Sequence, residues 1–155
     1  MSNFESDKEI LEFAIARENE AYNFYMALAD WVQDSHIRKL LEILAGEELE
    51  HKAALELEVT KTGRTISTEL KPSRPSSEYI LTNDQAPLDM DYKDVLLLGM
   101  EKENSAFRIY VSLIPRVYDE QSREVLFTLA QEEVKHKLRF ETEYNILQKN
   151  TRNQE

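Results

Sequence analysis

Two nine-residue segments of this chain are near copies of each other, LAGEELEHK at residues 44–52 and LAQEEVKHK at residues 129–137. Each copy holds a Glu-x-x-His step, from Glu48 to His51 in the first and from Glu133 to His136 in the second. The chain has only three histidines, so two of the three occur in this one context. The repeat indicates that a larger unit of the chain is duplicated.

The duplication extends well beyond these nine residues. When the chain is shifted by 85 positions, residues 18–59 fall on residues 103–144 without a gap, and 17 of the 42 positions are identical. The identical pairs include Glu18 with Glu103 and Tyr25 with Tyr110. We interpret the chain as two copies of one helical hairpin.

The spacing of apolar residues predicts an all-α fold. Only three glycines occur, three of the four prolines fall within residues 62–90, and apolar residues elsewhere recur every three or four positions. The predicted helices span residues 7–33, 35–61, 91–114 and 120–148. Residues 62–90 are rich in Ser, Thr and Pro and are expected to form a long crossover, while residues 149–155 are expected to be a disordered tail. Residues 1–155 then form a single domain.

Composition excludes several classes of function. The chain has no cysteine, which excludes disulfides, thiolate metal sites and a rubredoxin-type iron site within it. Its net charge of −11 disfavours nucleic acids and anionic membranes as partners. The longest apolar run, VLLLGM at residues 95–100, is too short to span a bilayer. A soluble, cytoplasmic protein is expected.

Helix geometry brings the repeated polar residues of the first hairpin to one level. A turn near Gln33 lies fifteen residues after Glu18 and fifteen before Glu48. At ~1.5 Å of rise per residue, both carboxylates lie ~22 Å from the turn. His51 follows Glu48 by three residues and therefore lies on the same helix face.

The second hairpin repeats this arrangement, with Glu103, Glu133 and His136 placed about a turn near Tyr118. Glu18 falls on the apolar stripe of its helix, so the glutamates are expected to point inward. Two such hairpins packed face to face would bring four carboxylates and two imidazoles together in a four-helix bundle.

Four buried carboxylates cannot all stay ionised at close range without compensation, because burial and mutual repulsion raise their pKa values. Two divalent cations would balance the four charges. This ligand set is that of ferritin-like dimetal proteins, and oxygen donors with one imidazole per metal suit iron or manganese better than copper or calcium. The predicted metal ligands are Glu18, Glu48, His51, Glu103, Glu133 and His136.

Other polar residues near the motifs have simpler interpretations. Four further glutamates fall off the ligand faces and are expected to be solvated: Glu20, Glu47, Glu50 and Glu132. His36 has Gln121 as its counterpart in the second half, so we expect it at the surface.

Two tyrosines, Tyr25 and Tyr110, follow Glu18 and Glu103 by seven residues on the same stripe. Two interpretations remain open for them. In the first, they only pack in the core. In the second, their hydroxyl groups hold the ligand carboxylates and act as proton donors near the metals.

At these motifs the sequence resembles the rubrerythrin family of the ferritin-like superfamily over nearly its whole length. The resemblance lies in ARENEAYNFY (16–25), EKENSAFRIY (101–110) and the two nine-residue segments. It implies a bundle with a long crossover and two irons bridged by Glu48 and Glu133. It further implies terminal ligands from Glu18, Glu103 and the two repeated histidines.

The resemblance also implies an activity, the reduction of hydrogen peroxide with electrons that pass through a rubredoxin-type domain. This chain lacks such a domain, so a separate donor such as a rubredoxin-like protein is expected. Fuller members carry an additional carboxylate where Ala106 stands here, which leaves the peroxide-specific ligand change open.

Three other functions remain open at this stage: ferroxidase chemistry, oxygen activation, and iron binding or storage without turnover. The expected cofactor is two iron ions, with manganese as the alternative, and the expected oxidant is peroxide or oxygen. A homodimer is the expected assembly.

Overall fold

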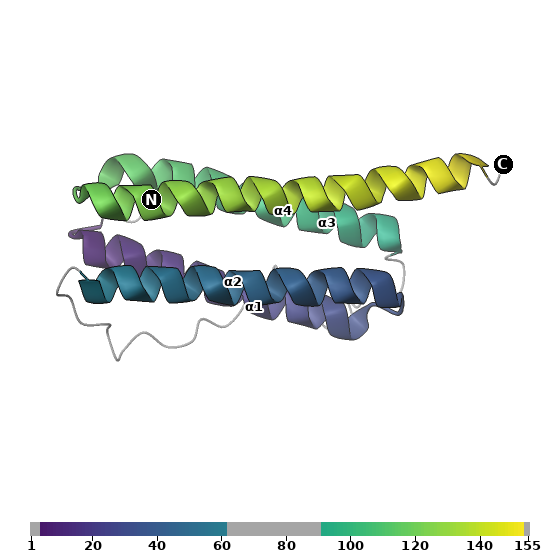
Figure 1. The fold of residues 1–155 in the computed structure, drawn as a ribbon, viewed down its shortest axis with the longest axis horizontal. Helices are drawn as coiled ribbons and strands as arrows, with labels where there is room; N and C mark the ends of the chain where they lie inside the picture. Colours follow the sequence, from purple (N-terminus) through teal and green to yellow (C-terminus); the bar gives the residue numbers. More distant parts are fainter. Residues whose placement is uncertain (1–3, 62–90, 154–155) are drawn as a thin grey trace.

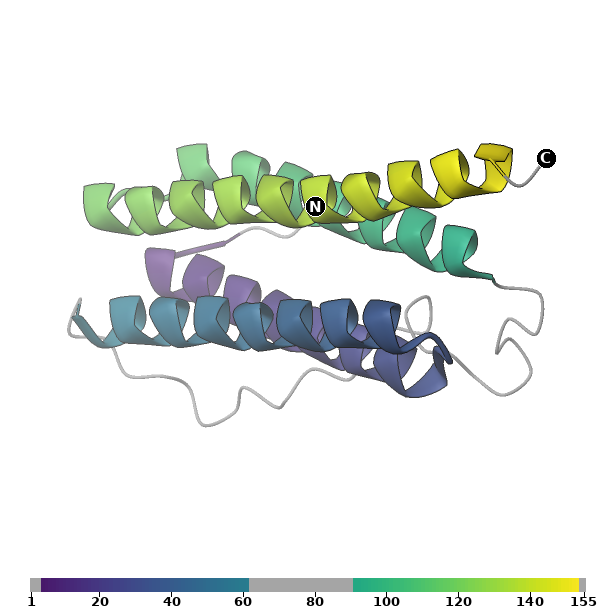
Figure 2. The ribbon, with the colours of Figure 1, turned by 45° about the vertical axis from the view of Figure 1, so that its right-hand side comes forward.

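The computed structural model describes residues 4–61 and 91–153. Its helices are α1 (Asp7–Trp31), α2 (Ser35–Lys61), α3 (Tyr92–Leu113), the 3-10 helix η1 (Ile114–Arg116) and α4 (Glu120–Asn153). They pair as two antiparallel hairpins, α1 with α2 and α3 with α4, and one hairpin lies against the other (Figure 1, Figure 2). The predicted four-helix bundle is confirmed, whereas the crossover at residues 62–90 lies outside the described residues.

The helix boundaries follow the duplication seen in the sequence. Tyr92 and Glu120, the first residues of α3 and α4, lie 85 positions after Asp7 and Ser35, which begin α1 and α2. The same shift that aligns the two halves of the sequence therefore relates the two hairpins.

Three helix ends differ from the predicted ones. α1 stops two residues before residue 33, and α3 stops at Leu113 because Pro115, which has no N–H to donate, turns the chain into η1. α4 continues five residues beyond residue 148, into the segment predicted to be a disordered tail. No Gly or Pro interrupts α4, and Leu147 still packs against the core near its end.

Polar side chains fix the starts of the helices. The Ser6 hydroxyl caps α1 by accepting a hydrogen bond from the Glu9 N–H, and Asp91 with Asp94 forms a complete capping box at α3. The buried Asp7 carboxylate accepts the backbone N–H groups of Tyr118 and Asp119, each at 2.9 Å. This contact ties the start of α1 to the turn between α3 and α4.

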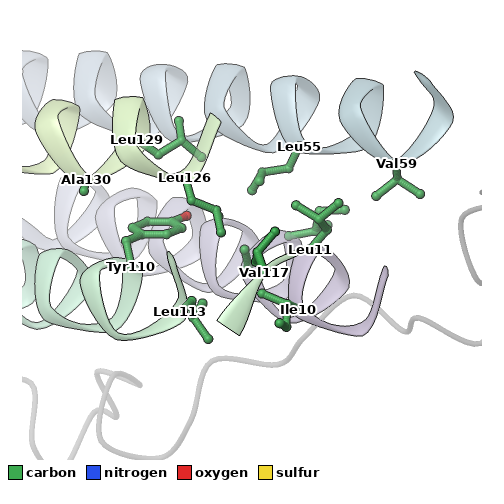
Figure 3. Packing of buried hydrophobic residues seen from close by; sticks show 12 residues of the cluster. Ile10, Leu11, Leu55, Val59, Tyr110, Leu113, Val117, Leu126, Leu129 and Ala130 are labelled. Atoms are coloured by element: carbon green, nitrogen blue, oxygen red, sulfur yellow. The ribbon is translucent and has the colours of Figure 1, made fainter. Parts of the chain in front are cut away.

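Apolar side chains form two core clusters, one toward each end of the bundle. The first includes Ile10, Leu11, Leu55, Leu113 and Leu126, and the Tyr110 ring lies among them (Figure 3). The second gathers around Phe24, Leu28, Leu41, Leu96 and Phe140. None of the helices within residues 4–61 and 91–153 has an apolar stretch long enough to cross a membrane.

Gly99 is required in α3 by its contact with a buried aromatic ring. A Cβ atom added there would lie 2.5 to 2.7 Å from three atoms of the Phe140 ring, which is fully buried. In the first half the equivalent positions hold Ala14 and Leu55, so a larger residue on one helix is matched by a smaller one on the other. The total volume is conserved while its division between the helices differs.

We predict that Gly99→Ala lowers the free energy of unfolding by about 1–2 kcal/mol, since overpacking outweighs the gain in helix propensity. Gly46→Ala is the matched control, because a Cβ atom there meets nothing within 4 Å. It should stabilise the protein by up to about 1 kcal/mol. Urea unfolding of both variants measures the difference, and equal stabilities would contradict this packing.

Candidate metal centre

The six residues predicted as metal ligands come together between the two core clusters. Each helix contributes at least one of them: Glu18 from α1, Glu48 and His51 from α2, Glu103 from α3, Glu133 and His136 from α4. All six are buried, and the most exposed of them, His51, shows only 7% of its surface. The bundle therefore holds four carboxylates and two imidazoles in its interior.

The helical repeat places these side chains on the buried faces. Glu18 lies three residues after the buried Ile15 and three before the buried Ala21, on the side of α1 that packs inward. Glu48 occupies the same kind of position on α2, between Ala45 and His51. The polar residues thus interrupt apolar stripes that would otherwise be continuous.

Beside a smaller group of Glu48, His51 and His136, two overlapping groups of four ligand atoms form within this cluster, and in each the atoms lie within 4.8 Å of one another. One group consists of Glu18, Glu48, His51 and Glu133, and the other of Glu48, Glu103, Glu133 and His136. Glu48 and Glu133 belong to both. Two adjacent metal ions would find two shared carboxylates here, with one further glutamate and one imidazole for each.

The two histidines both direct Nδ1 toward the carboxylates. His51 Nδ1 lies 3.2 Å from Glu133 Oε1 and 3.5 Å from Glu18 Oε2, yet it makes no hydrogen bond with either. His136 Nδ1 lies 2.9 Å from Glu48 Oε1 and 3.3 Å from Glu103 Oε1. The two rings are nearly parallel, with an interplanar angle of 9° and centroids 5.5 Å apart.

The buried charges perturb one another strongly. Burial, followed by the charge of Glu18, raises the pKa of Glu48 well above its usual range, and burial with the charge of Glu103 does the same for Glu133. Burial opposes ionisation of Glu103 as well, but hydrogen bonding by Glu133 and His136 lowers its pKa. Burial would lower the pKa of His136, yet the neighbouring carboxylates raise it to about 11.

Several buried polar atoms of the cluster have no hydrogen-bond partner among the described residues. They include Glu18 Oε2, Glu48 Oε2, His51 Nδ1, Glu103 Oε2 and Glu133 Oε1. Buried polar atoms are nearly always satisfied in folded proteins, and leaving one unpaired costs about 1–3 kcal/mol. Oxygen and imidazole donors that point into one shared space fit two divalent cations, which would satisfy these atoms together.

Each predicted tyrosine holds a glutamate of the opposite hairpin. The Tyr25 hydroxyl on α1 donates a hydrogen bond to Glu103 Oε1 on α3, and the Tyr110 hydroxyl on α3 donates one to Glu18 Oε1 on α1. Burial, followed by the charge of the glutamate it contacts, raises the pKa of each hydroxyl well above its usual value. Both tyrosines therefore keep their protons and orient the terminal carboxylates.

His36 lies outside the centre, as predicted. Its side chain is 69% exposed, and its Nε2 lies 3.0 Å from Glu143 Oε2. Glu50 is exposed and Glu20 is partly exposed, in accordance with their expected solvation.

Comparison with known proteins shows which protein family the chain belongs to. The sequence model of the rubrerythrin family matches residues 9–144 of the chain. The chain belongs to the rubrerythrin family. None of the curated proteins matches the sequence.

Solved structures of other proteins have a fold similar to that of this rubrerythrin-family chain. A hypothetical protein from Pyrococcus furiosus has a TM-score of 0.67 and 23% identity, over 94% of this chain and 92% of that one. KatB, a manganese catalase from Anabaena PCC7120, has a TM-score of 0.68 and 17% identity, over 94% of this chain and 75% of that one. At these identities the likeness concerns the fold alone.

The prediction that Glu47 is simply solvated is wrong. Glu47 Oε1 lies 3.2 Å from His136 Nε2, the ring nitrogen that faces away from the cluster, and Glu47 Oε2 accepts a hydrogen bond of 2.6 Å from Arg139. A carboxylate on this second nitrogen fixes the tautomer of a ligand histidine and its ring orientation. Glu47 stands off the face of Glu48 on its own helix but points across to α4, which the spacing within α2 could not reveal.

This contact also makes the two halves of the rubrerythrin-family centre unequal. The counterpart of Glu47 is Glu132, whose carboxylate lies 3.2 Å from Lys135 instead. The counterpart of Arg139 is Ala54, which carries no charge. The identity of Glu47 and Glu132 was a signal in the sequence, but only the fold shows which of the two reaches a histidine.

We predict that Glu47→Gln weakens binding of one of the two metals by about tenfold or more, because His136 loses its charged partner. Glu132→Gln makes the same chemical change at the equivalent position and should leave both affinities unchanged. Anaerobic titration of each folded variant with ferrous iron against a competing chelator measures both binding steps. Equal affinities for the two variants would show that Glu47 does not position His136.

Proposed function

We propose that this protein is a non-haem diiron oxidoreductase that reduces hydrogen peroxide with electrons from a separate donor. The observation that supports it most is the pair of overlapping ligand groups that share Glu48 and Glu133. Membership of the rubrerythrin family supports the same reading. Two iron ions in adjacent positions supply, when bound, the two electrons that the reduction of one peroxide to water requires.

The protein's own residues would hold the metal ions in the interior of the bundle. Glu48 and Glu133 would bridge the two metals, while Glu18 with His51 and Glu103 with His136 would complete one metal position each. All six are buried, with at most 7% of the surface of any one of them exposed. Charges inside this low-dielectric region act more strongly than they would at the surface.

Proton delivery falls to the two tyrosines in this proposal. Cleavage of an O–O bond to give water requires protons, and Tyr25 and Tyr110 keep theirs because burial raises their pKa values. Each hydroxyl already donates to the Oε1 atom of a terminal glutamate, Glu103 or Glu18. The carboxylates are weaker bases than a phenolate, so each phenol keeps its proton until a strongly basic oxygen, such as one released when the O–O bond breaks, can accept it.

Manganese is the second candidate metal, because the same oxygen and imidazole donors suit it. The fold likeness to KatB, a protein described as a manganese catalase, favours that candidate. The chain has no cysteine to hold a rubredoxin-type iron, and we propose that a rubredoxin-like or other separate protein donates the electrons. We further propose a cytoplasmic homodimer, in which exposed apolar residues of α4 such as Phe127 and Leu138 are covered.

We predict that the diferrous protein is oxidised faster by hydrogen peroxide than by oxygen. Anaerobic stopped-flow titration of the reduced protein with each oxidant gives the two rates. Glu48→Ala should abolish the fast reaction because it removes a bridging ligand, whereas His36→Ala, a surface change, should leave both rates unaltered. A faster reaction with oxygen would instead favour ferroxidase or oxygen-activating chemistry, and slow reaction with both would favour an iron-binding or storage module.

A further inference from the structure

A pocket between α1 and α3 leads to the carboxylates of the metal centre. Glu18 and Glu48 line it, and both bear buried oxygens that have no hydrogen-bond partner among the described residues. Three alanines on its walls, Ala14, Ala21 and Ala106, leave room where larger side chains would fill the space between the helices. The pocket has room for about one water molecule and lies between the partly exposed Arg17 and Ala106 and the ligand carboxylates.

Two cations flank this pocket. Arg17 and Lys102 both line the pocket, and they are equivalent positions of the two halves, each directly before a terminal glutamate. Lys102 is buried, with Nζ 5.5 Å from the centroid of the Phe24 ring. Arg17 and Lys102 thus face the same small pocket, where the charges of Glu20, Glu103 and Glu48 also act on Lys102.

Both cations would attract an anion in the pocket, which would join the carboxylates that already act on Lys102. The chain as a whole carries a net charge of −11, so an anion approaching elsewhere meets repulsion. Bound metals would neutralise the carboxylates at the end of the pocket, and the two cations would then give this entrance a positive potential.

The α2 and α4 helices present a different set of side chains to the centre. The rings of His51 and His136 stack on each other there, and Glu47 contacts both His136 and Arg139. His136 is fully buried, and an anion approaching from this side would meet the Glu47 carboxylate first.

We propose that the pocket between α1 and α3 admits small anions of the size of hydroperoxide to the metal centre. Arg17 and Lys102 supply the charge that attracts them, and Ala106 keeps the route open. This proposal rests on the dimetal function proposed above and identifies the face from which that site takes its ligand.

The test uses azide as the anionic probe on diiron-loaded protein. Iron content is measured first, since a parent protein that fails to hold two irons would overturn the dimetal function itself, before any question of access. Azide association is then followed by visible absorption in the stopped-flow spectrophotometer at low and high ionic strength. The variants are Lys102→Gln and, as control, Lys93→Gln, which removes the same charge from an exposed position nine residues earlier, on the opposite face of α3.

For Lys102→Gln we expect azide association about fivefold slower than in the parent, with a weaker dependence on salt. Lys93→Gln should behave like the parent. If Lys102→Gln holds two irons and binds azide as Lys93→Gln does, the cation pair does not attract anions and the proposal is overturned. If Lys102→Gln loses its irons, Lys102 serves the structure of the site and the assigned role is wrong.

A steric variant tests the route without changing any charge. Ala106→Val narrows the pocket and should slow azide association and dissociation together, leaving the equilibrium affinity nearly unchanged. Ala53→Val places the same side chain at an exposed position of α2 and should alter neither rate. Unchanged rates in a diiron-loaded Ala106→Val protein would show that anions enter elsewhere.

Discussion

The mutual repulsion of four buried carboxylates is the constraint on which the rest of this structure depends. Glu18, Glu48, Glu103 and Glu133 are each about 98% or more buried, at the centre of the bundle. Without compensation, such a cluster drives protons onto its members, as the raised pKa values of Glu48 and Glu133 show. The surrounding side chains counter that tendency, with two histidines inside the cluster and two tyrosines that donate to the terminal glutamates. Two divalent cations would complete the compensation.

The duplication makes the two halves of this centre nearly symmetric, and a few residues make its halves and its faces differ. Tyr25 and Tyr110 cross between the hairpins in the same way, so each half orients a ligand of the other. Glu47 and Arg139 break the pattern by supporting His136 alone. Arg17 and Lys102 keep the pattern but distinguish the α1–α3 face from the α2–α4 face. The α1–α3 face therefore presents two cations beside the carboxylates, whereas the α2 and α4 helices hold the two histidines.

Sequence reasoning predicted the fold and the clustering of the six polar residues because a repeat and a helical period together determine both. The 85-residue shift predicted which helices pair. Glu18 and Glu48 are equally far from the turn between their helices, which predicted that their carboxylates lie side by side, as the structure shows. Sequence reasoning did not reach Glu47, because residues adjacent in a helix point about 100° apart, and only the packing of α2 against α4 brings this one back to a histidine. The clash that keeps Gly99 small was equally hidden, since it depends on the ring of Phe140, 41 positions away in the sequence. Side-chain contacts between helices, within one hairpin for Gly99 and between the two hairpins for Glu47, cannot be deduced from the helical period alone.

The most direct test of a dimetal centre is a crystal structure of the protein loaded with iron or manganese, with diffraction measured on both sides of the absorption edge of the metal. Two anomalous peaks are predicted within the cluster, one in reach of His51 Nδ1 and Glu18, the other in reach of His136 Nδ1 and Glu103, with Glu48 and Glu133 bound to both. A single peak, or metal bound only outside these six side chains in fully loaded protein, would contradict the central claim.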